Sequence, residues 1–349
     1  MTSNGNGRRL VVDLRARASA WALPAEGAER LRASAPPGWE LVFVDSLTSS
    51  DGDGGASPSD EVRAAVTEAE AYFGFGMARA LFSSAPRLRW IHSASAGVGG
   101  LLFSDVRSSD VIVTNSAGVH AVPMAEYMLG GILYLLKSFD VAVEHQRSGI
   151  WDKSAFAGPA GKLRELRDCR VLVLGAGGIG SALATRLTML GARCTAVRRR
   201  PELGIPEGFE RVAGPDDWYD LLPEADVLVI AAPATSETKH MVTGEVLDRL
   251  PHDAILVNVA RGSLLDESAL VERLRSGRLR GAVLDVFEEE PLPASSPLWG
   301  LPSVLLTPHV SAVSPHGFWE RELSLFVDNW HRYVEGKEMR NVVDKEAGY

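Results

Sequence analysis

Short apolar runs alternate with amphipathic stretches along the first third of the chain. The stretches between the runs have helical spacing and cover residues 25–35, 61–68 and 77–84. The runs themselves are LVVDL, ELVFVDS, AEAYFGF and LRWIHSAS. This βαβα alternation predicts a parallel sheet that is covered by helices on both faces.

The apolar positions of residues 124–147 recur every three or four residues, which predicts one long helix. A second βα series starts at Arg170, and a helical tail over 315–335 is expected to pack back on the first domain. The strands of the second series are RVLVL, CTAV, DVLVIAA, AILVNVA, GAVLDVF and SVLLTPH. The pattern predicts two doubly wound α/β domains with parallel sheets, residues 1–115 plus 313–349 and residues 116–312.

The charge, the lengths of the apolar stretches and the cysteine content exclude several kinds of partner and site. The chain has 36 Lys and Arg against 45 Asp and Glu, a net charge of −9, so we expect no nucleic acid partner. No apolar stretch reaches the length of a membrane span, so we expect no membrane partner. Cys169 and Cys194 lack the spacing of a zinc site or a disulfide framework, so we expect no metal and a reducing, cytoplasmic location.

A glycine-rich turn follows the first strand of the second series. It lies between the apolar run 171–174 and a helical stretch over 181–190, which is the context in which G-x-G-x-x-G predicts a dinucleotide site. The glycines allow a tight turn, close approach of a pyrophosphate to backbone N–H groups, and close packing of helix on strand. The expected cofactor residues in this turn are Gly175, Gly177, Gly178, Ile179 and Gly180.

Arginine follows the second strand where an acidic residue usually binds the adenosine ribose. A carboxylate at this position would repel a 2′-phosphate, whereas the guanidinium groups of Arg198 and Arg199 could bind one through charge-assisted hydrogen bonds. We therefore expect NADP(H) to be the preferred cofactor, with NAD(H) also possible. The alternative is a solvated basic turn. Pro233, after DVLVIAA, is also assigned to the cofactor site.

Polar residues follow three of the later strands, where ligands bind in an open parallel sheet. Arg261 follows AILVNVA, Asp285 and Glu290 lie at and beyond the end of GAVLDVF, and His309 follows SVLLTP. A cation, a carboxylate and an imidazole beside a nicotinamide are the groups that reversible reduction of a ketone by hydride requires.

The chain resembles the D-isomer-specific 2-hydroxyacid dehydrogenase family, which includes glyoxylate/hydroxypyruvate reductases. The matching stretches are SASAG, NSAGVHAVPMAE, GAGGIG, VNVARGSLLDESAL, LDVFEEEPLP, TPHVSA and GKEMRNVVD. The resemblance implies a Rossmann cofactor domain inserted into a flavodoxin-like substrate domain. It further implies that Arg261 binds the 2-oxo acid, Glu290 partners the imidazole, His309 is the acid/base, and Asp285 contacts the nicotinamide carboxamide. The backbone of Ala96, Gly97 and Val98 would hold the substrate carboxylate.

We therefore expect NADPH-dependent reduction of a small 2-oxo acid to the D-2-hydroxy acid. The alternatives are an NAD-linked D-2-hydroxyacid or phosphoglycerate dehydrogenase, and a nucleotide-sensing module that resembles corepressors and has little turnover. Residues 140–167, with Trp151 and Phe156, resemble the dimer arm of the family, so we expect a homodimer.

Overall fold

The chain folds into two compact units in the structure, a computed structural model that describes residues 7–48, 58–159, 161–315 and 317–348. The first unit comprises Met1–His120 and Val313–Tyr349, and the second comprises Ala121–Ala312. The first unit is therefore discontinuous in sequence. The chain passes from the first unit to the second a few residues after the expected position, 115/116.

Five parallel strands form the sheet of the first unit, in the order β2-β1-β3-β4-β5. The order reverses between β1 and β3, as in a flavodoxin-like doubly wound fold, which confirms the predicted class. The strands are β1 (Arg8–Asp13), β2 (Trp39–Phe43), β3 (Ala71–Gly74), β4 (Trp90–Ser93) and β5 (Ile112–Asn115). The helices are α1 (Ala25–Ala33), α2 (Asp60–Val66), α3 (Arg79–Phe82), α4 (Ser104–Arg107) and α11 (Phe318–Val334).

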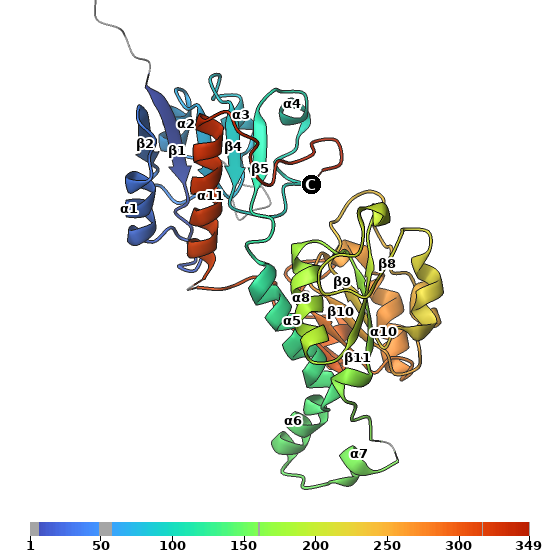
Figure 1. The fold of residues 1–349 in the computed structure, drawn as a ribbon. Coiled ribbons are helices and arrows are strands. Elements are labelled where there is room, and N and C mark those ends of the chain that lie inside the picture. The colour runs from blue at the N-terminus through green and yellow to red at the C-terminus, as the bar shows by residue number, and fades with distance from the viewer. Residues whose placement is uncertain (1–6, 49–57, 160, 316, 349) are drawn as a thin grey trace, which may run out of the picture. The chain divides into compact units, whose positions relative to one another are not determined.

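Helix α11 brings the end of the chain back onto the first sheet, as its helical pattern predicts. Figure 1 shows α11 beside α1 on one face of this sheet. Phe326 of α11 stacks on Phe73 at 4.0 Å and on Trp90 at 5.2 Å between ring centroids, and all three are fully buried. These contacts bury enough apolar surface to make α11 part of the core of the first unit.

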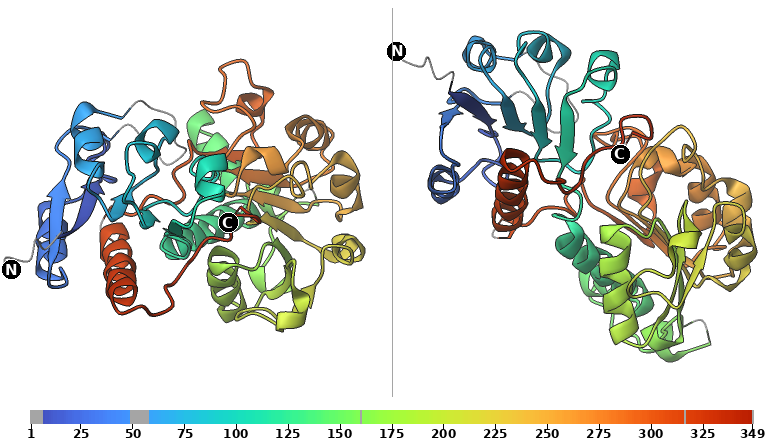
Figure 2. Two further views of the ribbon diagram at one scale, coloured as in Figure 1. Left: turned by 90° about the horizontal axis from the view of Figure 1, so that it is seen from above. Right: turned by 45° about the horizontal axis from the view of Figure 1, so that its top comes forward.

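Seven parallel strands form the sheet of the second unit, in the order β12-β11-β10-β9-β6-β7-β8, and the two views of Figure 2 show this sheet with its covering helices. The reversal between β6 and β9 is the Rossmann arrangement. The strands are β6 (Arg170–Leu174), β7 (Arg193–Val197), β8 (Arg211–Ala213), β9 (Val227–Ile230), β10 (Ile255–Asn258), β11 (Gly281–Leu284) and β12 (Val304–Leu306). The short edge strand β8 is missing from the series predicted from the sequence, because three residues carry too little pattern.

The helices of the second unit cover both faces of its sheet and enclose two apolar clusters. The α-helices are α5 (Ala121–Leu136), α6 (Phe139–Ser148), α7 (Ser154–Ala157), α8 (Gly178–Met189), α9 (Gly244–Arg249) and α10 (Glu267–Arg275). The 3-10 helices are η1 (Leu166–Asp168), η2 (Pro201–Leu203), η3 (Trp218–Glu224), η4 (Gly262–Leu264) and η5 (Pro297–Gly300).

The single helix predicted over 124–147 is wrong, because the stretch forms α5 and α6 with a break at Ser138, whose φ is +52°. Arg280 stabilises the break. Its guanidinium donates to the Leu135 carbonyl at 2.9 Å and to both carboxylate oxygens of Asp140 at 2.7 and 2.8 Å. The side chains of Arg280 and Asp140 are both buried, so this bidentate pair fixes the start of α6 beside the break.

Candidate active site

The glycine turn between β6 and α8 has the shape of a nucleotide cradle. Gly175 has a φ of +103°, and a Cβ there would lie 2.6 Å from the backbone of Ala231 and Ala232. A Cβ on Gly180 would overlap the Gly175 carbonyl, whereas a Cβ on Gly177 would meet no atom within 4 Å. Two of the glycines are thus required by packing, and Gly177 leaves open space at the N-terminus of α8.

The remaining residues of the turn begin helix α8. Gly178 is its first residue, and Ile179 packs against the apolar cluster under the turn. The free N–H groups of this first helical turn, with the positive end of the helix dipole, form an anion site. These residues fit the pyrophosphate of a dinucleotide.

Arg198 and Arg199 directly follow β7, where a ribose-binding carboxylate would otherwise stand. Arg198 is half-buried, its backbone N–H donates to the Ala213 carbonyl at 3.1 Å, and its Nη1 lies 3.5 Å from the Gly204 carbonyl. Arg199 is exposed. The predicted cofactor residue Pro233 is exposed after β9, and its carbonyl accepts a hydrogen bond from the Thr238 hydroxyl at 2.7 Å.

His309 and Glu290 form a solvent-accessible pair in the second unit. The His309 Nδ1 lies 2.8 Å from Glu290 Oε2, and the two side chains are 41% and 35% exposed. Glu290 Oε1 accepts the Phe287 amide at 2.9 Å, so its carboxylate is fixed at both oxygens. Because an ionised carboxylate only accepts, Nδ1 carries a proton toward Glu290, and Nε2 is the ring nitrogen left for a substrate.

Arg261 follows β10 in a loop that packs against the Glu290 loop. Buried Asn258 holds this loop through its side chain, which donates to the Arg261 carbonyl at 3.1 Å and accepts the Ala260 amide at 3.1 Å. A Cβ on Gly262 would overlap the Phe287 carbonyl group. Only glycine therefore allows the loop that carries the Arg261 guanidinium to approach the loop that carries Glu290.

Asp285 is fully buried, and its carboxylate binds groups of its own unit. One oxygen, Oδ1, accepts the Val310 amide at 2.8 Å and the Thr307 hydroxyl at 2.5 Å, and Oδ2 accepts the Ser311 amide at 2.9 Å. Its neighbours are thus the residues on either side of His309. The sequence motifs gave no sign of these contacts.

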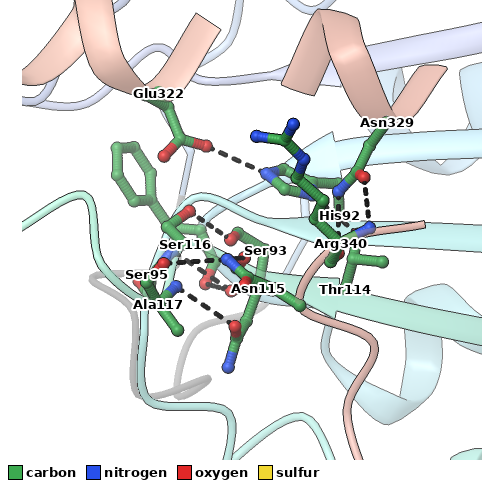
Figure 3. Close-up of polar contacts among 12 residues, drawn as sticks. His92, Ser93, Ser95, Thr114, Asn115, Ser116, Ala117, Glu322, Asn329 and Arg340 are labelled. Atoms are coloured by element: carbon green, nitrogen blue, oxygen red, sulfur yellow. Dashed lines mark hydrogen bonds and ion pairs between the residues drawn. The ribbon is translucent and has the colours of Figure 1, made fainter. Parts of the chain in front are cut away.

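The predicted substrate residues Ala96, Gly97 and Val98 lie in the first unit, directly beyond β4. The last residue of β5 holds this loop, because the Asn115 side chain donates to the Ala96 carbonyl at 2.9 Å. The same side chain accepts the Ala117 amide at 3.1 Å (Figure 3). Asn115 is a further candidate that sequence reasoning missed, although its position at the end of a strand, in the stretch NSAGVH, was a usable signal.

A second histidine–glutamate pair lies in the core of the first unit. His92 Nε2 is 3.1 Å from Glu322 Oε1, its Nδ1 is 2.7 Å from the Thr114 hydroxyl, and Figure 3 shows the pair bridging α11 to the sheet. Both side chains are 0% exposed. Their burial separates them from any solvent-borne substrate, in contrast to His309 and Glu290.

Metal-binding clusters and membrane-spanning helices are both absent from the described part of the chain. Within residues 7–48, 58–159, 161–315 and 317–348, no group of three or more His, Cys, Asp or Glu side chains could hold a metal ion. Over the same ranges, no helix has both the length and the apolar character needed to cross a membrane.

Comparison with known proteins agrees with the resemblance found in the sequence. Residues 129–311 match the family described as D-isomer specific 2-hydroxyacid dehydrogenase, NAD binding domain. The (S)-sulfolactate dehydrogenase of Chromohalobacter salexigens is 33% identical over 73% of this chain and 80% of its own. The glyoxylate/hydroxypyruvate reductase B of Serratia proteamaculans is 32% identical over 82% and 88%.

A solved structure extends the similarity to nearly the whole chain. The D-isomer specific 2-hydroxyacid dehydrogenase from Xanthobacter autotrophicus Py2, in complex with NADPH and MES, has 30% sequence identity and a TM-score of 0.79, with 98% of this chain and all of the other (100%) covered. The family match, the similarity to named oxidoreductases and the shared fold together confirm the inference from the sequence motifs. The chain therefore belongs to the D-isomer-specific 2-hydroxyacid dehydrogenase family, NAD(P)-dependent oxidoreductases that act on CH–OH groups.

Proposed function

We propose that this enzyme uses NADPH to reduce a small 2-oxo acid, such as glyoxylate or hydroxypyruvate, to the D-2-hydroxy acid. The observation that carries the proposal is the accessible His309–Glu290 pair, at 2.8 Å, in the same unit as the glycine turn and the Arg261 loop. Relatives named as glyoxylate reductases support this substrate class.

The glycine turn would hold the pyrophosphate of the dinucleotide, whose nicotinamide would supply a hydride to the carbonyl carbon of the substrate. His309 holds a proton on Nε2 and delivers it to the carbonyl oxygen. Glu290 orients the imidazole through Nδ1 and, as a negative neighbour, favours its protonated form. Arg261 donates to the substrate carboxylate and carbonyl, where charge develops. The backbone of Ala96, Gly97 and Val98 is a further donor set for the carboxylate.

The choice of NADP(H) over NAD(H) rests on the end of β7. Arg198 and Arg199 offer guanidinium donors to a 2′-phosphate, and no carboxylate stands there to bind the two ribose hydroxyls of NAD. Solved relatives with NADPH or NADP bound, from Xanthobacter autotrophicus and Sinorhizobium meliloti, are consistent with this choice. Gly175, Gly177, Gly178, Ile179, Gly180, Pro233 and Asp285 are the other residues assigned to the cofactor site.

A screen of NADPH oxidation tests the function. The substrates are glyoxylate, hydroxypyruvate, pyruvate, phenylpyruvate, branched 2-oxo acids, and the 2-oxo acid that corresponds to sulfolactate, because a sulfolactate dehydrogenase is among the relatives. We expect turnover with at least one small acid. Tight NADPH binding without oxidation by any of them would contradict the proposal and favour a nucleotide-sensing module.

The assignment of His309 has its own test. His309→Ala is expected to lower kcat by about 10²- to 10⁴-fold, the usual effect of losing a general acid, while NADPH binds as before. His252→Ala, which changes a histidine of the same unit whose side chain is 66% exposed, is the matched control. Unchanged turnover in His309→Ala would remove this residue from the mechanism.

We also propose that the enzyme is a homodimer in which α6, α7 and the segment between them pack against a second copy of the chain. Neither helix has a buried apolar residue, and apolar side chains are exposed in α6, at Phe139, and between the two helices, at Ile150 and at Trp151, which is 90% exposed. The buried Arg280–Asp140 pair fixes the start of α6, so this apolar surface is held in place.

Sedimentation velocity tests the dimer. Ile150→Ser with Trp151→Ser should weaken association, whereas Met189→Ser, a control at an 82% exposed residue of α8, should not. A wild-type monomer at micromolar concentration would refute the proposal.

We further propose a cytoplasmic location, since both cysteines are free and buried, and cell fractionation would test it.

A further inference from the structure

The backbone at the proposed acid/base is held in an unusual conformation. His309 has a φ of +52°, in the left-handed region that non-glycine residues rarely adopt. Its own amide donates to the Asp285 carbonyl at 2.9 Å, and the next two amides, of Val310 and Ser311, donate to the Asp285 carboxylate. Three successive N–H groups thus donate to Asp285. Together they hold His309 in the backbone conformation that orients its imidazole.

The Asp285 carboxylate is itself oriented by a hydroxyl relay. Asp285 and Thr307 directly follow the paired strands β11 and β12, in which Leu284 lies opposite Leu306, so the two side chains emerge side by side. The Thr307 hydroxyl donates to Asp285 Oδ1 at 2.5 Å, and the Tyr127 phenol of α5 lies 2.6 Å from the Thr307 oxygen. Because the single proton of Thr307 is directed to a carboxylate, Tyr127 is the donor to Thr307.

We propose that Thr307 is a positioning residue for His309, and that Tyr127 supports it from α5. This inference rests on the proposed function of His309 as the general acid. Without the hydroxyl, Oδ1 loses its shortest contact and keeps only the Val310 amide, so the buried carboxylate, held by one donor fewer, turns from its present orientation. The amides of Val310 and Ser311 then lose their acceptor. Because these bonds hold His309 in its left-handed conformation, its backbone relaxes and the imidazole moves away from Glu290.

The relay meets the acid/base residue at its backbone, because the Asp285 carboxylate accepts the two amides that follow His309. Thr307 and the Val310 amide contact the same oxygen, Oδ1, and all the residues of the relay belong to the second unit. Loss of the relay should therefore affect kcat, which depends on the orientation of the imidazole, rather than the KM for the 2-oxo acid. A merely structural role would lower thermal stability without this selectivity.

The central experiment compares Thr307→Val, which has nearly the same shape but no hydroxyl, with Thr307→Ser, which keeps the hydroxyl. Thr307→Val should lower kcat about 10- to 100-fold, in line with the cost of a misplacement of about 1 Å, while the KM for the 2-oxo acid changes less than about twofold. Thr307→Ser should recover most of the loss, and Tyr127→Phe should show a smaller decrease. Equal kcat in the valine and serine variants would overturn the inference.

A double-mutant comparison separates this inference from the proposed function. In the His309→Ala background, measured by single turnover at high enzyme concentration, Thr307→Val should have almost no further effect on the rate. An undiminished effect there would show that Thr307 acts elsewhere. If His309→Ala itself kept full activity, the proposed mechanism would fail, whatever the outcome for Thr307.

A second readout does not depend on activity. With ¹⁵N-labelled histidine, the Nδ1–H proton of His309 should give a hydrogen-bonded imidazole signal, assigned by its disappearance in His309→Ala. The signal should persist in Thr307→Ser and be lost to exchange with water in Thr307→Val, because the imidazole leaves Glu290. A persistent signal in the valine variant would contradict the positioning role.

Discussion

Replacement of Arg198 and Arg199 by alanine is the perturbation that most directly tests how this enzyme selects its cofactor. Arg198 is half-buried and fixed at its backbone by the bond from its amide to the Ala213 carbonyl. The hydrogen bond of its guanidinium to the described residues is long, 3.5 Å to the Gly204 carbonyl. Little has to be broken for this side chain to turn to a 2′-phosphate. Arg199 is exposed, so solvent screens its contribution.

The magnitude follows from these two environments. A hydrogen bond to a charged group contributes about 1.5 to 3 kcal/mol, and about 1.4 kcal/mol corresponds to a factor of ten. One contact from Arg198 at the lower end gives about tenfold, and a second, screened contact from Arg199 raises the preference to at most about a hundredfold. We therefore expect kcat/KM to be about 10 to 100 times higher with NADPH than with NADH, and this ratio to approach one in the double variant.

Initial rates with each reduced cofactor, at a fixed concentration of the best 2-oxo acid, measure the ratio. Arg193→Ala is the matched control, because Arg193 is an exposed arginine at the opposite end of the same strand, β7. Added salt should lower the ratio, since the Debye length falls from about 10 Å at 0.1 M to about 3 Å at 1 M. Equal or better kinetics of the wild type with NADH would refute the reasoning and leave the arginines as a solvated basic turn.

Three further predictions concern stability and reactivity. Arg280→Met should destabilise the second unit by about 3 to 5 kcal/mol in urea unfolding, because it leaves the buried carboxylate of Asp140 unpaired, and adding Asp140→Leu should recover most of the loss. Burial raises the pKa of Asp13, so its ionised form is disfavoured on folding and its contribution to stability is lost as the pH rises through the folded pKa. Asp13→Asn, which can still accept the Tyr72 hydroxyl, should therefore raise Tm relative to wild type more at pH 7 than at pH 3, and an equal gain at both would contradict this. Burial raises the pKa of Cys194 to about 12, so this thiol should react with a disulfide reagent only after unfolding, and rapid reaction of the native protein would show that the thiol is accessible.

Local pattern was sufficient for the fold class and the family. Strands buried on both faces appear as continuous apolar runs, and helices between them require a parallel sheet, so both sheets could be predicted without tertiary information. The glycine turn is equally local, because its requirement for glycine arises within one strand–turn–helix unit: Gly180 lies against the Gly175 carbonyl five residues before it. The proposed roles of Arg261, Glu290 and His309 also rest on sequence motifs, and they stay predictions until kinetics test them.

Contacts between distant parts of the chain decided the rest. The break at Ser138 depends on Arg280, which binds Asp140 across 140 residues of sequence, and helical periodicity carries no sign of such a partner. Tyr127 and Thr307 are 180 residues apart, and each has the pattern of an ordinary helix or strand-end residue by itself. Gly262 is needed only because the Phe287 backbone lies against it. The hydrophobic pattern around a residue indicates how its segment is buried. Which distant residue it contacts depends on which strands become neighbours, and the order of the strands is established only in the folded sheet.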